Sequence, residues 1–184
     1  TDKKKFDAAI LSIVETNDST LWAATDVNGL YKIINETKVV AYDTTDGLPS
    51  VTKIQVEKFL GEMYVLTKHG IYQYDAKTDT FVQNPLFDGR YNDRFVKFLY
   101  PLKNRSAFVV YKIGDKEILE KVNYKNGQYT ARKIPFSRLT VRQYYNIYQD
   151  PGGVFWFSTS EGVISYHPGE ETPLDEYQTL IRET

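Results

Sequence analysis

The chain carries an internal repeat of about 45 residues, and this repeat limits its fold more than any single motif does. Three copies share an apolar run, a polar turn, an aromatic residue three positions before a threonine, and a glycine-aliphatic pair. The aromatic residues are Trp22, Tyr64 and Trp156, spaced by 42 and then 92 residues. Because 92 is two steps of 46, a fourth copy is expected near the apolar run at 107–111, with Val110 in the place of the tryptophan. The spacing therefore predicts four units.

Each unit contains short segments that are typical of β-strands. In the second unit, apolar and polar residues alternate over 51–56 and again over 70–75, and short apolar runs cover 63–67 and 80–83. These segments are rich in Val, Ile, Tyr, Phe and Thr, and turn residues separate them. No window of 11 or more residues keeps a helical period. Four short antiparallel strands in a repeat of this length predict a β-propeller blade.

The fold predicted is therefore all-β, a β-propeller segment of about four four-stranded antiparallel blades. The repeats lie near residues 8–43, 50–84, 94–133 and 142–167. The last has room for three strands, at 144–149, 154–159 and 162–166, and residues 1–7 resemble an outer fourth strand that could complete it. Four blades are the low end of the known range, so we expect the segment to belong to a larger, seven-bladed ring.

Composition excludes several classes of protein. Lys and Arg number 23 against 24 Asp and Glu, so the net charge of -1 does not indicate a nucleic-acid binder. No apolar run reaches the roughly 18 residues of a membrane span. The absence of cysteine excludes disulfides, zinc fingers and thiol catalysis.

The repeat resembles a known family. The segments 46–50 (DGLPS), 21–25 (LWAAT) and 155–159 (FWFST), with glycine-aliphatic pairs at 29–30 and 162–163, are similar to the Reg_prop repeats of two-component regulators. The third unit departs from this pattern, and the second has Tyr64 in place of tryptophan. The resemblance covers nearly the whole chain, from about Phe6 to Tyr166.

This resemblance implies a function. It suggests a ligand-sensing or signal-relay segment of a periplasmic two-component sensor that responds to glycan fragments, homodimeric in the parent protein. Residues 168–184 would lead into a following Ig-like (Y_Y_Y) domain, and the remaining propeller blades would be intramolecular partners. The kinase residues of such sensors lie outside this chain, so the resemblance implies no enzymatic activity and no cofactor here.

Two loops group residue types that suit sugar or carboxylate recognition. The insertion at 85–94 supplies Arg90, Tyr91, Asn92 and Arg94, and the loop at 135–142 supplies Arg138 and Arg142. The region 100–142 carries ten Lys or Arg against three acidic residues, a net charge of +7, which would favour an anionic ligand or an acidic neighbouring surface. Solvated loops and a solvated outer strand are the alternative interpretation of the same residues.

Other functions stay open at the level of sequence. A protein–protein interaction propeller with no small-molecule ligand is the main alternative. A propeller lyase or hydrolase would need His and acidic residues clustered at the central channel, and the chain has only His69 and His167. No catalytic residue and no metal ligand is therefore predicted, and Thr25, Thr67 and Thr159 are expected to form hydrogen bonds within strands or turns.

Overall fold

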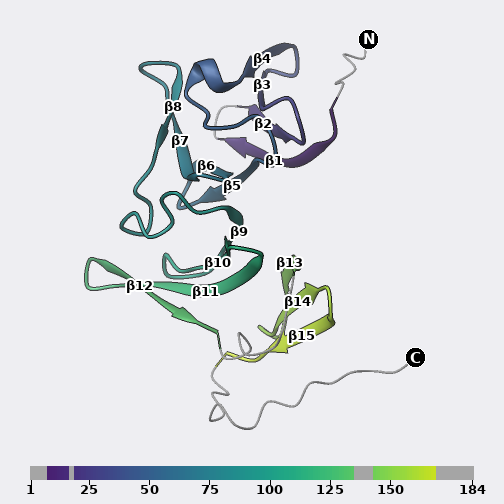
Figure 1. Cartoon of the computed structure of the whole chain (residues 1–184), viewed down its shortest axis with the longest axis vertical. Coiled ribbons are helices and arrows are strands. Elements are labelled where there is room, and N and C mark those ends of the chain that lie inside the picture. Colours follow the sequence, from purple (N-terminus) through teal and green to yellow (C-terminus); the bar gives the residue numbers. More distant parts are fainter. Residues whose placement is uncertain (1–7, 17–18, 135–142, 169–184) are drawn as a thin grey trace.

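A computed structural model describes residues 8–16, 19–134 and 143–168 of the chain. It contains four antiparallel sheets that follow one another along the chain and pack as successive blades (Figure 1). The all-β propeller architecture predicted from the repeat is confirmed. Within the described residues, the single helical element is the 3-10 turn η1 (Thr44–Asp46).

Each blade is a meander in which consecutive strands pair. Blade one is β1 (Ile10–Thr16), β2 (Thr20–Thr25), β3 (Leu30–Ile34) and β4 (Lys38–Tyr42). Blade two is β5 (Gln55–Phe59), β6 (Glu62–Thr67), β7 (Gly70–Asp75) and β8 (Thr80–Gln83). Blade three is β9 (Val96–Pro101), β10 (Ala107–Ile113), β11 (Lys116–Lys125) and β12 (Gln128–Lys133). Blade four has three strands among the described residues, β13 (Tyr144–Gln149), β14 (Phe155–Thr159) and β15 (Gly162–Tyr166).

The hydrophobic cores lie between the blades. Side chains alternate along each strand, so one set faces the preceding blade and the other set faces the following blade. Blades one and two bury a cluster around Trp22, Val65 and Phe81, and blades three and four bury another around Phe108 and Phe157. A third cluster joins blades two and three. Every internal blade is therefore sandwiched between two apolar contacts.

Two sequence predictions need correction. The strand expected over 51–56 begins only at Gln55, because residues 51–53 form bends and Lys53 has a positive φ of 54°.

The third repeat is anchored by Phe108 rather than Val110. Strand pairing skips a residue opposite Val110 and Tyr111, as it does at the same place in blades one and four. Aligned on that bulge, Tyr111 matches Thr25 and Thr159, and Phe108 matches Trp22 and Trp156.

The recurring threonines close the turns after the second strands, as expected. Their hydroxyl groups donate hydrogen bonds of 2.8 to 2.9 Å to glycine carbonyls, in the pairs Thr25–Gly29, Thr67–Gly70 and Thr159–Gly162. The DGLPS segment has a similar structural role. Gly47 ends η1 with a φ of 89°, and a Cβ atom there would lie 2.3 Å from the carbonyl oxygen of Phe81. Only glycine fits this approach between blade one and blade two.

Candidate functional site

The link between blades two and three folds into a series of tight turns against blade three. Phe87 and Tyr91 in this link are buried in the core between the two blades. The ring of Phe87 meets the ring of Tyr129 on β12 edge-on, with centroids 5.0 Å apart. The backbone N–H of Tyr129 also donates to the carboxylate of Asp88 at 3.3 Å. The predicted 85–94 insertion is therefore an anchored structure that holds its polar side chains at defined positions.

A buried carboxylate, Glu120, organises this region. It lies on β11 with its side chain almost wholly buried. Arg90 donates two hydrogen bonds of 2.9 Å to its oxygens, one from Nε and one from Nη2. The hydroxyls of Tyr91 and Tyr111 each donate a further bond of 3.1 Å. Four donors therefore satisfy the carboxylate, and they tie the link from blade two to the middle of blade three.

The pKa values of these groups follow from this geometry. Burial alone would raise the pKa of Glu120, but the hydrogen bonds and charge of Arg90, together with the two tyrosine hydroxyls, lower it. Burial and the negative charge of Glu120 raise the pKa of Tyr91 well above its usual value. Hydrogen bonding to Glu120 likewise raises the pKa of Arg90. The network is therefore a fixed ion pair with neutral tyrosines at physiological pH.

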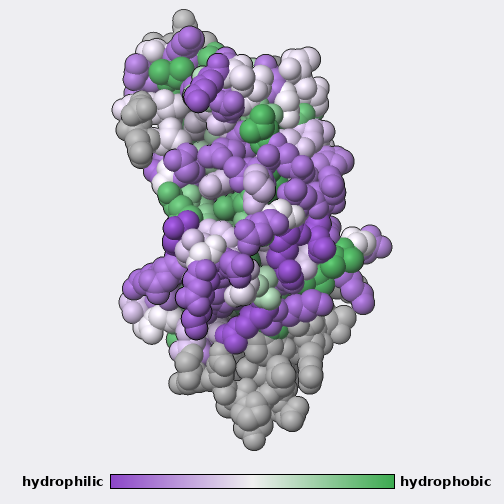
Figure 2. All heavy atoms as spheres, turned by 90° about the vertical axis from the view of Figure 1, so that its left-hand side faces the viewer, coloured by the Kyte–Doolittle hydropathy of each residue, from purple (hydrophilic) through white to green (hydrophobic). Residues whose placement is uncertain are grey.

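A hollow of about 380 Å³ lies beside this network, a size typical of small-ligand sites. It is lined by residues of the link and of the outer strands of blade three: Phe87, Asp88, Arg90, Arg94, Val122, Tyr129, Thr130 and Ala131. The outer side of blades two and three faces the viewer in Figure 2, where hydrophilic residues cover most of the surface and hydrophobic atoms show at mid-height. The hollow thus combines cationic, anionic, hydroxyl and aromatic groups in one place.

Arg94 differs from Arg90 in its partners. Its half-buried guanidinium lies 5.1 Å from the ring centre of Tyr111, in a cation–π contact. Among the described residues it forms no ion pair with a carboxylate. Arg94 therefore presents hydrogen-bond donors to the hollow, whereas Glu120 already occupies two donors of Arg90.

The predicted site residues fall into three groups. Arg90, Tyr91 and Arg94 come together around Glu120 and the hollow. Asn92 is exposed, and its backbone N–H donates to Gly89 at 3.0 Å within the turn. Arg138 and Arg142 lie outside the described residues.

Sequence reasoning missed the two glutamates that organise blade three. It counted Glu117 and Glu120 only as charges in a basic region, although both are buried in β11 together with Leu119 and Val122. Their side chains leave β11 on opposite sides, Glu120 toward blade two and Glu117 toward blade four. An acidic residue at a buried position of a strand was the signal that could have identified them.

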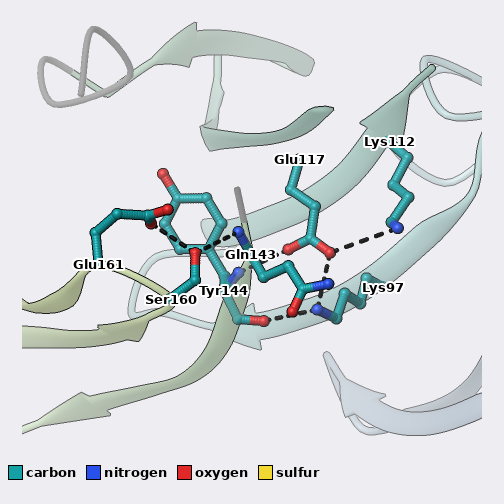
Figure 3. Close-up of polar contacts among 7 residues, drawn as sticks. All are labelled: Lys97, Lys112, Glu117, Gln143, Tyr144, Ser160 and Glu161. Carbon is teal, nitrogen blue, oxygen red and sulfur yellow. Dashed lines mark hydrogen bonds and ion pairs between the residues drawn. The ribbon is translucent and has the colours of Figure 1, made fainter. Parts of the chain in front are cut away.

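Glu117 joins blade three to blade four (Figure 3). One carboxylate oxygen accepts a 2.8 Å bond from Lys97 Nζ, and the other accepts a 2.7 Å bond from the backbone N–H of Tyr144. Lys97 Nζ also donates to the carbonyl of Tyr144 at 2.8 Å, and Lys112 Nζ lies 3.9 Å from Glu117. Both backbone groups at the start of β13 are thereby held by side chains of blade three.

Comparisons with known proteins concern the fold. A scan of protein-family models gives no match, and no curated protein matches the chain, so the Reg_prop resemblance stays a prediction. The extracellular domain of a putative hybrid two-component system from B. thetaiotaomicron is similar, with a TM-score of 0.65 and 22% identity over 94% of this chain and 22% of that chain. The fold is shared. This chain spans about a fifth of the length of that domain.

Two further solved structures have weaker similarity. A streptogramin B lyase has a TM-score of 0.55 and 14% identity, over 89% of this chain and 56% of that chain. PorZ, a surface component of the type-IX secretion system of Porphyromonas gingivalis, has a TM-score of 0.53 and 14% identity, over 86% of this chain and 24% of that chain. The same architecture therefore occurs in the extracellular domain of a putative two-component system, a lyase and a secretion component, and fold alone does not select among these functions.

Two other kinds of site are absent from the part of the chain that the structure describes. No group of three or more His, Cys, Asp or Glu side chains there is arranged to hold a metal ion. No helix there is long and apolar enough to cross a membrane.

Proposed function

We propose that this chain is a ligand-sensing or signal-relay segment of a periplasmic two-component sensor, with no catalytic role of its own. The similarity to the extracellular domain of a two-component system supports this proposal. The proposed ligand is a fragment of an acidic glycan, bound in the hollow beside Arg94. The remaining propeller blades and an Ig-like domain of a longer protein would complete the sensor.

The arrangement of Arg94 is the observation that supports the ligand most directly. A half-buried guanidinium with no carboxylate partner among the described residues is suited to a planar anion such as the carboxylate of a uronic acid. Asp88 and Thr130 line the same hollow and would bond to sugar hydroxyls, and Tyr129 offers an aromatic surface. One acidic sugar unit could use all of these groups.

The hollow is also placed where occupancy could be transmitted. Its walls come from the link between two blades and from the outer strands of the next blade. Arg90 lines it and simultaneously binds Glu120, which lies in the core between these blades. A ligand that displaced Arg90 toward the hollow would therefore alter the contact between blades two and three.

A titration followed by calorimetry and amide NMR tests this proposal, with an oligogalacturonate as probe and a neutral oligosaccharide of the same length as control. We expect binding of the acidic probe alone, with shifts at Tyr129 and Thr130. The variant Arg94→Met should weaken binding by about tenfold or more, because a charge-assisted hydrogen bond is worth about 1.5–3 kcal/mol. Lys125→Met removes the same charge at the end of β11 and should leave the affinity within about twofold.

An equal loss of affinity for the acidic probe in both variants would indicate a general electrostatic attraction and would contradict a site at Arg94. Absence of binding to any acidic oligosaccharide would favour the alternative function, a protein–protein interaction propeller. Large apolar side chains exposed on blades one and four support that alternative.

A further inference from the structure

A second, smaller hollow lies where the first strands of three blades meet. Figure 1 shows the first strands β1, β5, β9 and β13 gathered at the centre, with the later strands of each blade radiating outward. The hollow has a volume of about 180 Å³, and its lining residues lie at or just before the beginning of β1, β5 and β9: Leu11, Lys53, Gln55, Phe95 and Lys97. None of them lines the hollow beside Arg94, so the two hollows are separate.

Two of the lining side chains come from β-bulges. On β1 the pairing with β2 skips Leu11, and on β9 the pairing with β10 skips Lys97. A bulge turns a side chain out of the regular alternation of the strand, and bulges are common beside active sites for this reason. Leu11 and Lys97 accordingly line the hollow and belong to none of the cores between blades.

Groups of blades three and four fix the position of Lys97. Its Nζ donates bonds of 2.8 Å to the carboxylate of Glu117 and to the carbonyl of Tyr144 (Figure 3). The side chain of Glu117 is only 1% exposed, so this anchor is shielded from water. The two bonds use two of the three N–H donors of the ammonium group, which leaves one for a ligand.

Lys53 brings a second cation to the hollow. It is exposed, and it forms no ion pair with a carboxylate among the described residues. Its backbone N–H donates to the carbonyl of Asp26 in blade one at 3.3 Å, while the carboxylate of Asp26 accepts the N–H of Ala9 at 3.0 Å. Neither Asp26 nor Glu117 lines the hollow, so its lining contains two ammonium groups and no carboxylate.

The remaining lining residues are apolar or neutral. Leu11 contributes an aliphatic side chain and Phe95 an aromatic ring, which lies 5.6 Å from Nζ of Lys112 in a cation–π contact. Gln55 adds an amide that can donate or accept a hydrogen bond. The hollow therefore joins a cationic side to an apolar side within a small volume.

We propose that this hollow is a binding site for a small carboxylate with an apolar body, of the class of monocyclic aromatic acids. The ammonium groups of Lys53 and Lys97 would bond to the carboxylate oxygens, and Leu11 and Phe95 would pack against the ring. A volume of 180 Å³ equals the share of about six water molecules in the liquid, which suits a single ring and not an oligosaccharide. The site is thus distinct from the glycan site in both place and ligand.

A titration of the whole chain with benzoate, followed by amide NMR, tests this proposal. We expect saturable shifts at Gln55 and Lys97, with a Kd in the millimolar range for a ligand of this size. Benzamide lacks the negative charge and acetate lacks the ring, so each should bind at least about tenfold more weakly.

Two lysine variants locate the binding of benzoate. Lys53→Met changes an exposed side chain, so folding should persist, and it should weaken benzoate binding at least about fivefold because a charge-assisted hydrogen bond is lost. Lys77→Met removes the same charge from an exposed turn of blade two and should leave the affinity within about twofold.

Four results would overturn the proposal. These are the absence of saturable shifts with benzoate, equal binding of benzamide, equal weakening by Lys53→Met and Lys77→Met, and shifts confined to Tyr129 and Thr130. The last result would place the carboxylate in the hollow beside Arg94. Because the oligogalacturonate titration is read at Tyr129 and Thr130 and the benzoate titration at Gln55 and Lys97, the two proposals can fail independently.

Discussion

The hydroxyl of Tyr111 donates a hydrogen bond to Glu120 at the position where the other three blades have a threonine. Those threonine hydroxyls close a local turn by donating to a glycine carbonyl. In blade three the equivalent hydroxyl instead reaches across to the next strand and joins a network that includes Arg90 and Tyr91. Blade three has therefore exchanged a local turn contact for a connection to blade two.

Removing the charge of Glu120 should destabilise the protein. Glu120→Gln leaves Arg90 without its bidentate partner, and the cost of breaking a buried ion pair is largest when both groups are inaccessible. The side chain of Arg90 is 45% exposed, so water can solvate part of its charge. We therefore expect the free energy of unfolding to fall by about 2 kcal/mol, less than the roughly 3–5 kcal/mol of a fully buried pair. Urea denaturation measures it, and Glu62→Gln, at an exposed position of β6, should change stability by less than about 0.5 kcal/mol. Equal stability of the two variants would contradict a structural role for the network.

Gly47 should tolerate no side chain. Alanine there would need a positive φ and would also place Cβ against the carbonyl of Phe81, so Gly47→Ala should cost more than about 2 kcal/mol. Gly61 has nearly the same φ, 88°, but a Cβ atom added there would meet no other atom within 4 Å. Gly61→Ala should therefore cost only about 1 kcal/mol, the backbone component alone. Thermal unfolding of both variants separates steric from backbone strain, and similar melting temperatures would refute the close approach at Gly47.

Glu117 should control the local stability of β13. With Glu117→Ala, the N–H of Tyr144 loses its acceptor, so we expect amide hydrogen exchange at Tyr144 and Ile147 to accelerate by about tenfold or more. Exchange in blade one should stay unchanged, which provides the control within the same sample. Uniform acceleration throughout the chain would instead show that the substitution lowers global stability.

Glu57 should make the protein less stable as the pH rises. Burial raises the pKa of Glu57 from 4.5 to about 7 in the folded state. Between these values the folded protein binds a proton that the unfolded chain has released, so the free energy of unfolding falls as the pH increases through this window. Above about pH 7 both states are ionised, and the loss, about 1–3 kcal/mol, is complete.

Glu57→Gln removes this titration. The variant should be more stable than the unmodified chain at about pH 8 and show a flatter profile between about pH 5 and pH 7. Denaturation at several pH values tests it, with Glu62→Gln as the exposed control in the same blade. A profile for Glu57→Gln that parallels that of the unmodified chain would contradict the assignment.

Local features of the sequence were sufficient for much of the fold. The bounds of β7 and β8 agree with the prediction, because alternating residues between Gly70 and Gln83 are interrupted by one polar turn at 75–79. The repeat of about 45 residues predicted the number of blades and their order. The prediction that Val110 takes the place of the tryptophan in the third repeat was wrong for an equally local reason. A bulge shifts the strand register there, and residue spacing does not reveal which residue is skipped.

The sequence by itself determined the strands, the blades and the loop that carries Arg90 and Arg94, since these depend on alternation and turn residues close together in the chain. Only the tertiary structure decided which charged side chains are already paired and which aromatic side chains are already buried. Glu120 meets Arg90 across 30 residues, and Trp22 differs from Trp156 because a neighbouring blade covers one and not the other. Burial and pairing depend on what packs against a residue from a distant part of the chain, and a repeat pattern shared between blades does not encode that neighbour.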